Sequence, residues 1–316
     1  MRRHNFFCCD GVSFSSNINL NHQPVLKNCN SFNLTTLGLI IWATCFKPCS
    51  VHAQEEVAPT RIIPFKQIGE VTLSLHLFLP EGHVTTDKKS AIVFFFGGGW
   101  VGGTPKQFFP QSAYLASRGM VAVCAEYRTK NGHQATPDKC VEDGKSAMRW
   151  VRHFASDLGI DPHRIAASGG SAGGHVAAAT ATVKGFNNEL DPKVDCTPRA
   201  LVLFNPVYDN GPDGYGYDRV KDYWESFSPM HNLDEKTPPT IVLLGSQDRL
   251  IPVETAETFQ SQMRALGLRS DLHLYEGQGH GFFNKNKYEE TLYQTDLFLT
   301  SLGLLTGEPT FQPEAE

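Results

Sequence analysis

The sequence has few charged residues and no excess of basic ones. Of its 316 residues, 19% are charged, and 28 Lys and Arg face 33 Asp and Glu, which gives a formal net charge of −5. No run of Lys or Arg is present, so the chain lacks the basic surface that displaces counterions from nucleic acids. A content of 41% hydrophobic and 11% aromatic residues also excludes a disordered chain. The length suits one large domain or two small ones.

Cysteine is scarce beyond the first fifty residues. Five of the eight cysteines lie before residue 50, and only Cys124, Cys140 and Cys196 follow. Three cysteines allow at most one disulfide, which excludes a disulfide-stapled scaffold, and their spacing is not that of a zinc site. The aspartates of segment 209–218 do not follow the spacing of an EF-hand calcium loop. We therefore expect no metal ion and no organic cofactor.

The first fifty-odd residues differ from the rest of the chain. They contain four basic residues, one acidic residue and the 13-residue apolar stretch Leu34–Phe46. This stretch has about the length of a signal-peptide core and is too short to span a bilayer comfortably. Val51 and Ala53 provide small residues near a cleavage site before Gln54. We interpret residues 1–53 as a signal peptide, which predicts an exported protein, periplasmic or extracellular, with no membrane span after cleavage. A buried N-terminal helix is the alternative.

After a polar linker at residues 54–60, the hydrophobic periodicity alternates between that of strands and that of helices. Strands are expected at Val71–Leu79, Ala91–Phe96, Met120–Ala125, Arg164–Ser168, Ala200–Phe204, Thr240–Leu244 and Asp271–Tyr275. Helices are expected at Gln111–Arg118, Lys139–Leu158, Gly174–Val183, Glu254–Leu266 and Tyr288–Leu304. This alternation predicts one α/β domain over residues 61–305, with a mostly parallel sheet and helices on both faces. The acidic tail at 306–316 is expected to be flexible.

One segment interrupts the alternation. Residues 205–224 are rich in Gly, Pro, Asp and Tyr, and they form a stretch too long for a simple connection. The segment is either a cap loop over a pocket or a packed surface loop, and the sequence favours neither.

A serine lies at the centre of a G-x-S-x-G motif. Gly169–Gly173 places Ser171 between a short apolar strand and an alanine-rich helix. A serine at the tip of a tight strand-to-helix turn has a strained backbone, so its neighbours must lack bulk. The N-terminus of the following helix favours negative charge at the serine. The motif alone is weak, but its strand–turn–helix context indicates a nucleophile.

Two partners for this serine follow later strands. A serine hydroxyl becomes nucleophilic when an imidazole takes its proton and a carboxylate orients that imidazole. Asp248 follows the expected strand Thr240–Leu244, and His280 follows the strand Asp271–Tyr275 within a glycine-rich loop. We expect these two side chains to meet Ser171 at one end of the sheet. The chain order Ser, Asp, His differs from that of trypsin-like and subtilisin-like enzymes.

A third glycine-rich segment offers donors for a developing oxyanion. Gly97, Gly98, Gly99 and Trp100 follow a buried strand, and no side chain shields the N–H groups of the glycines. With the amide of Ala172 they predict a three-donor oxyanion hole. A plain glycine turn is the alternative. A P-loop is excluded, because the pattern G-x-x-x-x-G-K-[ST] is absent.

These motifs give the chain a resemblance to the α/β-hydrolase esterases of the hormone-sensitive-lipase and bacterial acetyl-esterase type. The similarity runs over residues 64–305 and includes FFFGGGW, EYR, GGSAGGH, GSQDRLIPV and GQGHGFF. It implies Ser171, Asp248 and His280 as catalytic residues and the amides of Gly98, Gly99 and Ala172 as oxyanion donors. The family usually has histidine where this chain has Phe96, so we expect packing to hold the glycine loop.

The resemblance implies an exported serine carboxylesterase that acts through an acyl-enzyme. We expect short acyl groups, such as acetyl groups on carbohydrates or small alcohols, as in acetyl xylan or feruloyl esterases. Trp100 and Tyr215 are candidate substrate-binding residues for this role. A peptidase or amidase of the prolyl-oligopeptidase type, a lipase, and a hydrolase fold that only binds are the alternatives.

Overall fold

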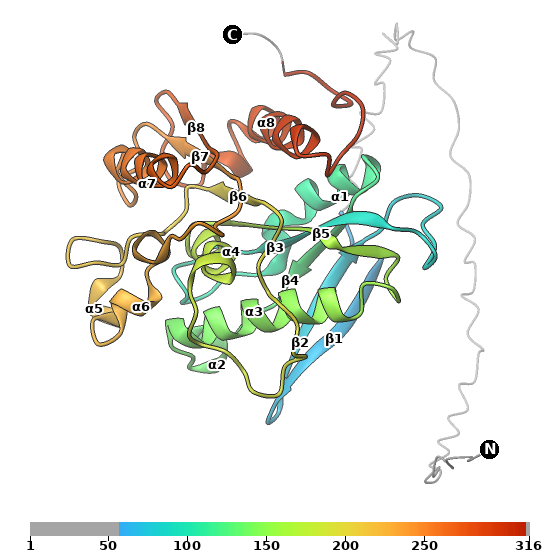
Figure 1. Cartoon of the computed structure of the whole chain (residues 1–316), viewed down its shortest axis with the longest axis horizontal. Coiled ribbons are helices and arrows are strands. Elements are labelled where there is room, and N and C mark those ends of the chain that lie inside the picture. The colour runs from blue at the N-terminus through green and yellow to red at the C-terminus, as the bar shows by residue number, and fades with distance from the viewer. Residues whose placement is uncertain (1–56, 314–316) are drawn as a thin grey trace, which may run out of the picture. The chain divides into compact units, whose positions relative to one another are not determined.

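The computed structural model describes residues 57–313, so the predicted signal peptide lies outside the described residues. Within this range, eight strands form one sheet in the order β1-β2-β4-β3-β5-β6-β7-β8 (Figure 1). The strand β2 is antiparallel to β1 and β4, and the other pairs are parallel. The strands are β1 (Arg61–Ile68), β2 (Val71–Phe78), β3 (Lys89–Phe95), β4 (Val121–Ala125), β5 (Ile160–Gly170), β6 (Leu201–Phe204), β7 (Thr240–Gly245) and β8 (Ser270–Tyr275).

Helices pack on both faces of this sheet, which confirms the predicted α/β-hydrolase architecture. Val93 and Phe95 of β3 belong to the core cluster under one set of helices, and Ile92 and Phe94 belong to the cluster on the opposite face. The first set is α3 (Pro137–His153), α4 (Ala172–Thr182) and α7 (Val253–Ala265), and the second is α1 (Phe109–Ser117) and α8 (Tyr288–Ser301). Because both faces of β3 are covered, its sequence is a continuous apolar run rather than an alternating one.

Two strand predictions were incomplete. The edge strand β1 was missed, because most of its side chains are exposed or half-buried and they show no hydrophobic alternation. The strand β5 begins at Ile160, four residues before the expected Arg164, because its polar first half also carries little apolar signal. Lys66 of β1 is nevertheless buried. Its Nζ donates to Asp143 Oδ1 of α3 at 2.7 Å, which joins the edge of the sheet to a helix.

The segment at 205–224 is packed rather than open. Val207, Tyr208, Asn210 and Val220 are at most 1% exposed. The chain continues through the short helices α5 (Tyr217–Val220), α6 (Trp224–Phe227) and η2 (Pro229–Asn232). We call residues 205–232 the cap segment. The other short helices are α2 (Lys130–His133), η1 (Pro105–Phe108) and η3 (Phe282–Asn284).

The tail also differs from the expectation, as far as it is described. Arg118 of α1 donates to the carbonyl oxygens of Thr306 and Gly307. The ring of Phe311 packs against Tyr114 and Tyr293 at centroid distances of 5.0 and 6.5 Å. Residues 306–313 are therefore held against α1 and α8 through an aromatic anchor.

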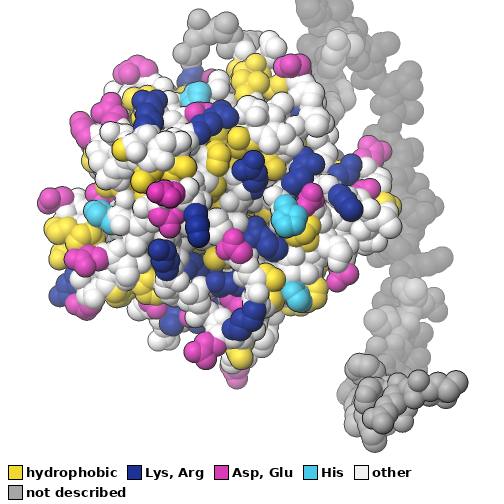
Figure 2. Space-filling view, viewed as in Figure 1, with side chains coloured by type: hydrophobic (Ala, Val, Ile, Leu, Met, Phe, Trp, Pro, Cys, Tyr) yellow, Lys and Arg dark blue, Asp and Glu magenta, His cyan; other side chains and the backbone are white. Residues whose placement is uncertain are grey.

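The surface carries charges of both signs, as the similar numbers of basic and acidic residues in the sequence predict. Figure 2 shows positive and negative side chains interspersed on the face it presents. In residues 57–313, no helix is both long enough and apolar enough to cross a bilayer.

Candidate active site

Ser171 lies at a sharp turn between β5 and α4. Its backbone has φ 55° and ψ −121°, which is a strained conformation for a residue with a side chain. The amide of Ser171 donates to Phe204 O of β6, and its carbonyl accepts from Val207 and from His175. These bonds hold the strained turn at the carboxyl edge of the sheet.

The glycines around the serine are required by close contact. A Cβ at Gly169 would overlap Gly173 O, and a Cβ at Gly173 would overlap the carbonyl oxygens of Phe95 and Phe96. Gly174 is also restricted, since its Cβ would lie 2.8 Å from Pro206 Cβ. The motif therefore brings α4 against β3 and places Ser171 beside the glycine loop.

The structure brings the three predicted triad side chains together. His280 Nε2 lies 2.9 Å from Ser171 Oγ, and His280 Nδ1 lies 2.7 Å from Asp248 Oδ2. The Asp248 carboxylate is fully buried, whereas the imidazole is 24% exposed. The ring thus faces the serine on one side and a buried charge on the other, which suits it to move a proton between Oγ and a substrate.

Asp248 is fixed by its own loop. Its Oδ1 accepts from the amides of Leu250 and Ile251 at 2.8 and 3.0 Å, which leaves Oδ2 for the imidazole. Hydrogen bonds to backbone amides stabilise a carboxylate in a buried position. Gln247 N also donates to Gln278 O at 2.8 Å, so the loops of the acid and the base are bonded directly to each other.

The glycine loop places unpaired amides near the serine. A Cβ on Gly97 would lie only 3.3 Å from Ser171 Cβ, so the loop begins beside the nucleophile. The amides of Gly98 and Gly99 have no hydrogen-bond acceptor among residues 57–313. The amide of Ala172 has no partner within its own helix, because it belongs to the first turn of α4. These are the three donors that the sequence predicted for an oxyanion.

Packing supports this loop at the position where the related esterases usually have histidine. Phe96 is 3% exposed and stacks on Tyr127 at a centroid distance of 4.1 Å and an interplanar angle of 11°. The hydroxyl of Tyr127 donates to Phe96 O, and Gly97 N donates to Gln107 Oε1, both at 2.5 Å. The sequence offered no signal for Gln107, because it lies ten residues away in an ordinary polar segment.

Trp100 does not occupy the role predicted for it. Its side chain is 1% exposed and packs edge-on against His175 and Phe227, so too little of the ring is accessible to stack on a substrate. Tyr215 is half-buried and remains a candidate, since its hydroxyl would lie 2.9 Å from a Cβ on Gly99. Trp100 is thus a buried support of the loop, and the prediction that it binds substrate is wrong.

Arg219 of the cap segment was not anticipated. Its Nη1 donates to Gly99 O at 2.6 Å, and its guanidinium lies 4.9 Å from the centroid of the Trp100 ring. A cation over an indole face is attracted to the ring. The cap segment therefore contacts the glycine loop. The sequence did not predict this contact, because a single Arg in a polar segment is typical of an exposed residue.

The rival residues lie in other environments. His175 is fully buried beneath the cap segment, and His231 faces the hydroxyl of Ser228 at 2.8 Å. Asp271 pairs with Arg269 at the edge of the sheet. Among residues 57–313, no three His, Cys, Asp or Glu side chains are grouped so that they could hold a metal ion.

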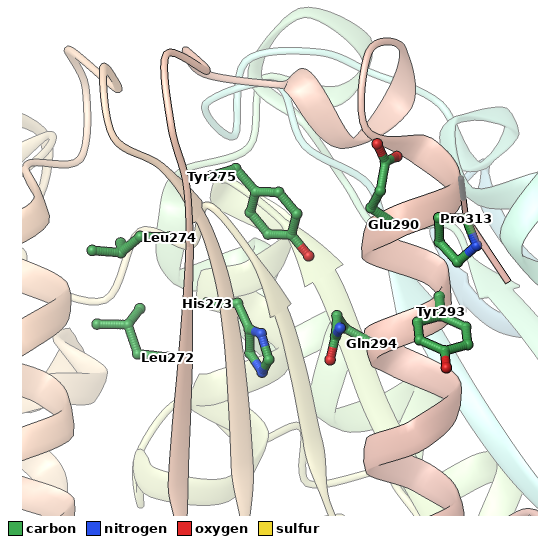
Figure 3. Close-up of a pocket in the computed structure, with 8 residues that line it drawn as sticks. All are labelled: Leu272, His273, Leu274, Tyr275, Glu290, Tyr293, Gln294 and Pro313. Carbon is green, nitrogen blue, oxygen red and sulfur yellow. The ribbon is translucent and has the colours of Figure 1, made fainter. Parts of the chain in front are cut away.

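A separate groove of about 500 Å³ lies between β8 and α8 (Figure 3). Its walls come from one strand, one helix and the tail, namely Leu272, His273, Leu274, Tyr275, Glu290, Tyr293, Gln294 and Pro313. No triad or glycine-loop residue lines this groove, so it is not part of the candidate active site.

Comparison with known proteins finds esterases among the relatives of this chain. The chain matches the family BD-FAE over residues 75–209 and the dienelactone hydrolase family over residues 208–296. Esterase 2 of Thermogutta terrifontis, solved after phosphonylation by cyclosarin, is 40% identical, with a TM-score of 0.75 over 78% of this chain and 96% of that chain. The chain belongs to the α/β-hydrolase serine esterases. The same esterase with propionate bound is 38% identical, with a TM-score of 0.76 over 80% of this chain and 98% of that chain.

Relatives found by sequence are also esterases, and they match over a shorter range. Esterase LipC of Mycobacterium tuberculosis is 30% identical over 220 residues, which is 62% of this chain and 54% of that protein. An acetylxylan esterase of Xylanibacter ruminicola is 27% identical over 221 residues, which is 65% of this chain and 42% of that protein. The aligned part thus spans about half the length of these relatives.

Proposed function

We propose that this member of the α/β-hydrolase serine esterases is an exported carboxylesterase that hydrolyses short-chain acyl esters, with acetyl groups on carbohydrates or small alcohols as its substrates. The single observation that carries the proposal is the hydrogen bond of 2.9 Å between Ser171 Oγ and His280 Nε2, beside unpaired amides. Export rests on the leader at residues 1–53, which is predicted from the sequence alone.

In the proposed reaction, Ser171 Oγ attacks the ester carbonyl carbon while His280 Nε2 takes the hydroxyl proton. The carbonyl oxygen becomes negative and accepts from the amides of Gly98, Gly99 and Ala172. Loss of one such donor typically raises the barrier by about 2.7–4 kcal/mol. The imidazolium, held by Asp248, then gives its proton to the departing alcohol oxygen. Water activated by the same ring attacks the acyl-enzyme, releases the acid and restores the serine.

Two relatives support short acyl groups. Thermogutta terrifontis esterase 2 has been solved with propionate and with butyrate bound, and one relative is an acetylxylan esterase. The decisive measurement is the rate of hydrolysis of p-nitrophenyl esters from acetate to palmitate. We expect the highest kcat/KM for acetate to butyrate, and a preference for palmitate would instead indicate a lipase. Release of amino acids from aryl amides would indicate the peptidase alternative.

The nucleophile is tested by Ser171→Ala. We expect kcat to fall by about a millionfold, because the triad acts as a unit, while the fold persists. Ser168→Ala is the matched control. This neighbouring serine of β5 is fully buried and its hydroxyl has no hydrogen-bond partner among the described residues, so its variant should keep the native rate. Labelling by a fluorophosphonate probe should be lost in Ser171→Ala alone. A labelled, active Ser171→Ala enzyme would refute the assignment.

A further inference from the structure

Asn205 lies at the carboxyl end of β6, between the strand that carries the nucleophile and the strand that precedes the acid. It is fully buried and has φ +34°, a left-handed conformation that asparagine tolerates better than most residues. Its amide donates to Leu243 O of β7, which fixes its backbone in the sheet.

Its carboxamide contacts the base in two places. Asn205 Oδ1 accepts from the amide of Gly281, the residue after His280, at 2.9 Å. Because the oxygen is committed to this bond, the NH₂ group must face the opposite way, where Nδ2 lies 3.5 Å from His280 Nε2. Asn205 therefore contacts both the backbone of the base and the ring nitrogen that receives the proton.

The first contact adds a restraint to the loop that carries the base. Gly277 and Gly281 flank the base with positive φ, and a Cβ at either would meet no atom within 4 Å, so packing does not hold them. Hydrogen bonds from Gly277 N to Ser246 Oγ and from Gln247 N to Gln278 O hold the first half of the loop, and the hydrogen bond from Gly281 to the fully buried Asn205 holds the residue after the base. Small displacements of a reacting group have large effects on rate, so this restraint bears on turnover.

The second contact acts on the charge of the ring. An N–H donor that faces Nε2 is favourable while Nε2 carries a lone pair, and unfavourable once Nε2 is protonated. The other groups at the ring are Asp248 at Nδ1 and the hydroxyl of Ser171 at Nε2. Within residues 57–313, Asp248 provides the only salt bridge to the imidazole. The amide of Asn205 and the carboxylate of Asp248 thus face different nitrogens of the ring.

We propose that Asn205 is a positioning residue for His280, which anchors the base loop through Gly281 and keeps Nε2 directed at Ser171. This inference rests on the proposed esterase function. It assigns to Asn205 no contact with the substrate, so its loss should change kcat and the pH dependence rather than KM.

Two substitutions separate the contacts. Asn205→Gly keeps the left-handed backbone and removes both contacts, and we expect kcat on p-nitrophenyl acetate to fall by about 10- to 100-fold at unchanged KM. Asn205→Asp keeps the acceptor for Gly281 and places a carboxylate oxygen at Nε2. A negative charge there stabilises the imidazolium, so the acidic limb of the profile of kcat/KM against pH should move up by about one pH unit.

Asn210→Ala is the matched control, since Asn210 is an equally buried asparagine of the same segment whose Nδ2 donates to Tyr215 O instead. Its acidic limb should coincide with that of the native enzyme. If the acidic limb of the kcat/KM profile of Asn205→Asp also coincides with that of the native enzyme, the inference is wrong. This outcome decides the inference even if Asn205→Gly does not fold. A native protein that neither hydrolyses esters nor reacts with fluorophosphonate would overturn the proposed function instead. The activity of the native enzyme is therefore measured before the variants are compared, so that failure of the proposed function is distinguished from failure of the inference about Asn205.

Discussion

Phe96 shows how a single residue can replace a hydrogen-bonding support by packing. Its ring is buried against Tyr127, and a Cβ on Gly103 would lie 2.6 Å from its Cδ2, so both ends of the glycine loop close on this side chain. The carbonyl of the same residue accepts from the Tyr127 hydroxyl. An aromatic stack of this kind contributes beyond the buried area of its rings.

At this scale we predict that Phe96→Ala destabilises the protein and slows catalysis. Removal of a buried phenyl ring typically costs about 3–5 kcal/mol, which urea unfolding followed by circular dichroism measures. The kcat should fall as well, because the loop that carries the oxyanion donors loses its support. Tyr127→Phe keeps the stack and removes one hydrogen bond, so it should cost only about 0.5–1.5 kcal/mol. Equal losses in the two variants would contradict the packing account.

At the scale of the element, the unit formed by β5, Ser171 and α4 is limited by backbone contact. The carbonyl oxygens of Phe95 and Phe96 lie against Gly173, so the first turn of α4 touches β3 without any side chain between them. The distance from the helix N-terminus to the glycine loop depends on this contact.

We predict that Gly173→Ala shifts α4 away from β3. Overpacking of a rigid site costs about 1–3 kcal/mol or more, and the shift should reduce both thermal stability and the rate of fluorophosphonate labelling of Ser171. Gly185→Ala is the control, because a Cβ there meets no atom within 4 Å and its φ is not positive. Its free energy of unfolding should stay within about 0.5 kcal/mol of the native value. A Gly173→Ala protein with native stability and native labelling would contradict this reading.

At the scale of the whole molecule, the cap segment encloses a histidine that prefers to be neutral. His175 of α4 is fully buried and stacks on Phe227 at a centroid distance of 4.2 Å. Burial lowers the pKa of His175 to about 3. The unfolded chain binds a proton near pH 6.5, so acid favours unfolding over the range between these two values.

We therefore predict that stability falls as the pH is lowered from 7.0 to 5.5, and that His175 contributes about 1 kcal/mol to the fall. The variant His175→Leu should show a smaller fall by that amount in urea unfolding at the two pH values. Burial also lowers the pKa of His273, which adds a fall of the same sign in both proteins and cancels in the comparison. Identical pH dependence of the two proteins would show that His175 is not the group responsible.

Some residues of the site followed from the sequence and others did not. Ser171, Asp248 and His280 each sit just beyond an apolar strand, and such strands are recognised from composition alone. Asn205 also follows a strand, but it precedes a proline in a polar segment and resembles an ordinary turn residue. Gln107 accepts from the amide of Gly97, ten residues away, and Arg219 donates to the carbonyl of Gly99, 120 residues away. No local pattern in the sequence indicates either partner.

The sequence by itself determined the strand–helix alternation, the strained serine turn with its glycines, and the edge of the sheet where the triad meets, because these depend on local periodicity and on the absence of side chains. Only the tertiary structure decided that Trp100 is buried, that Phe96 stacks on Tyr127 and that Asn205 faces the base. Each of these depends on which surfaces pack together, and packing joins residues whose separation along the chain carries no periodic signal.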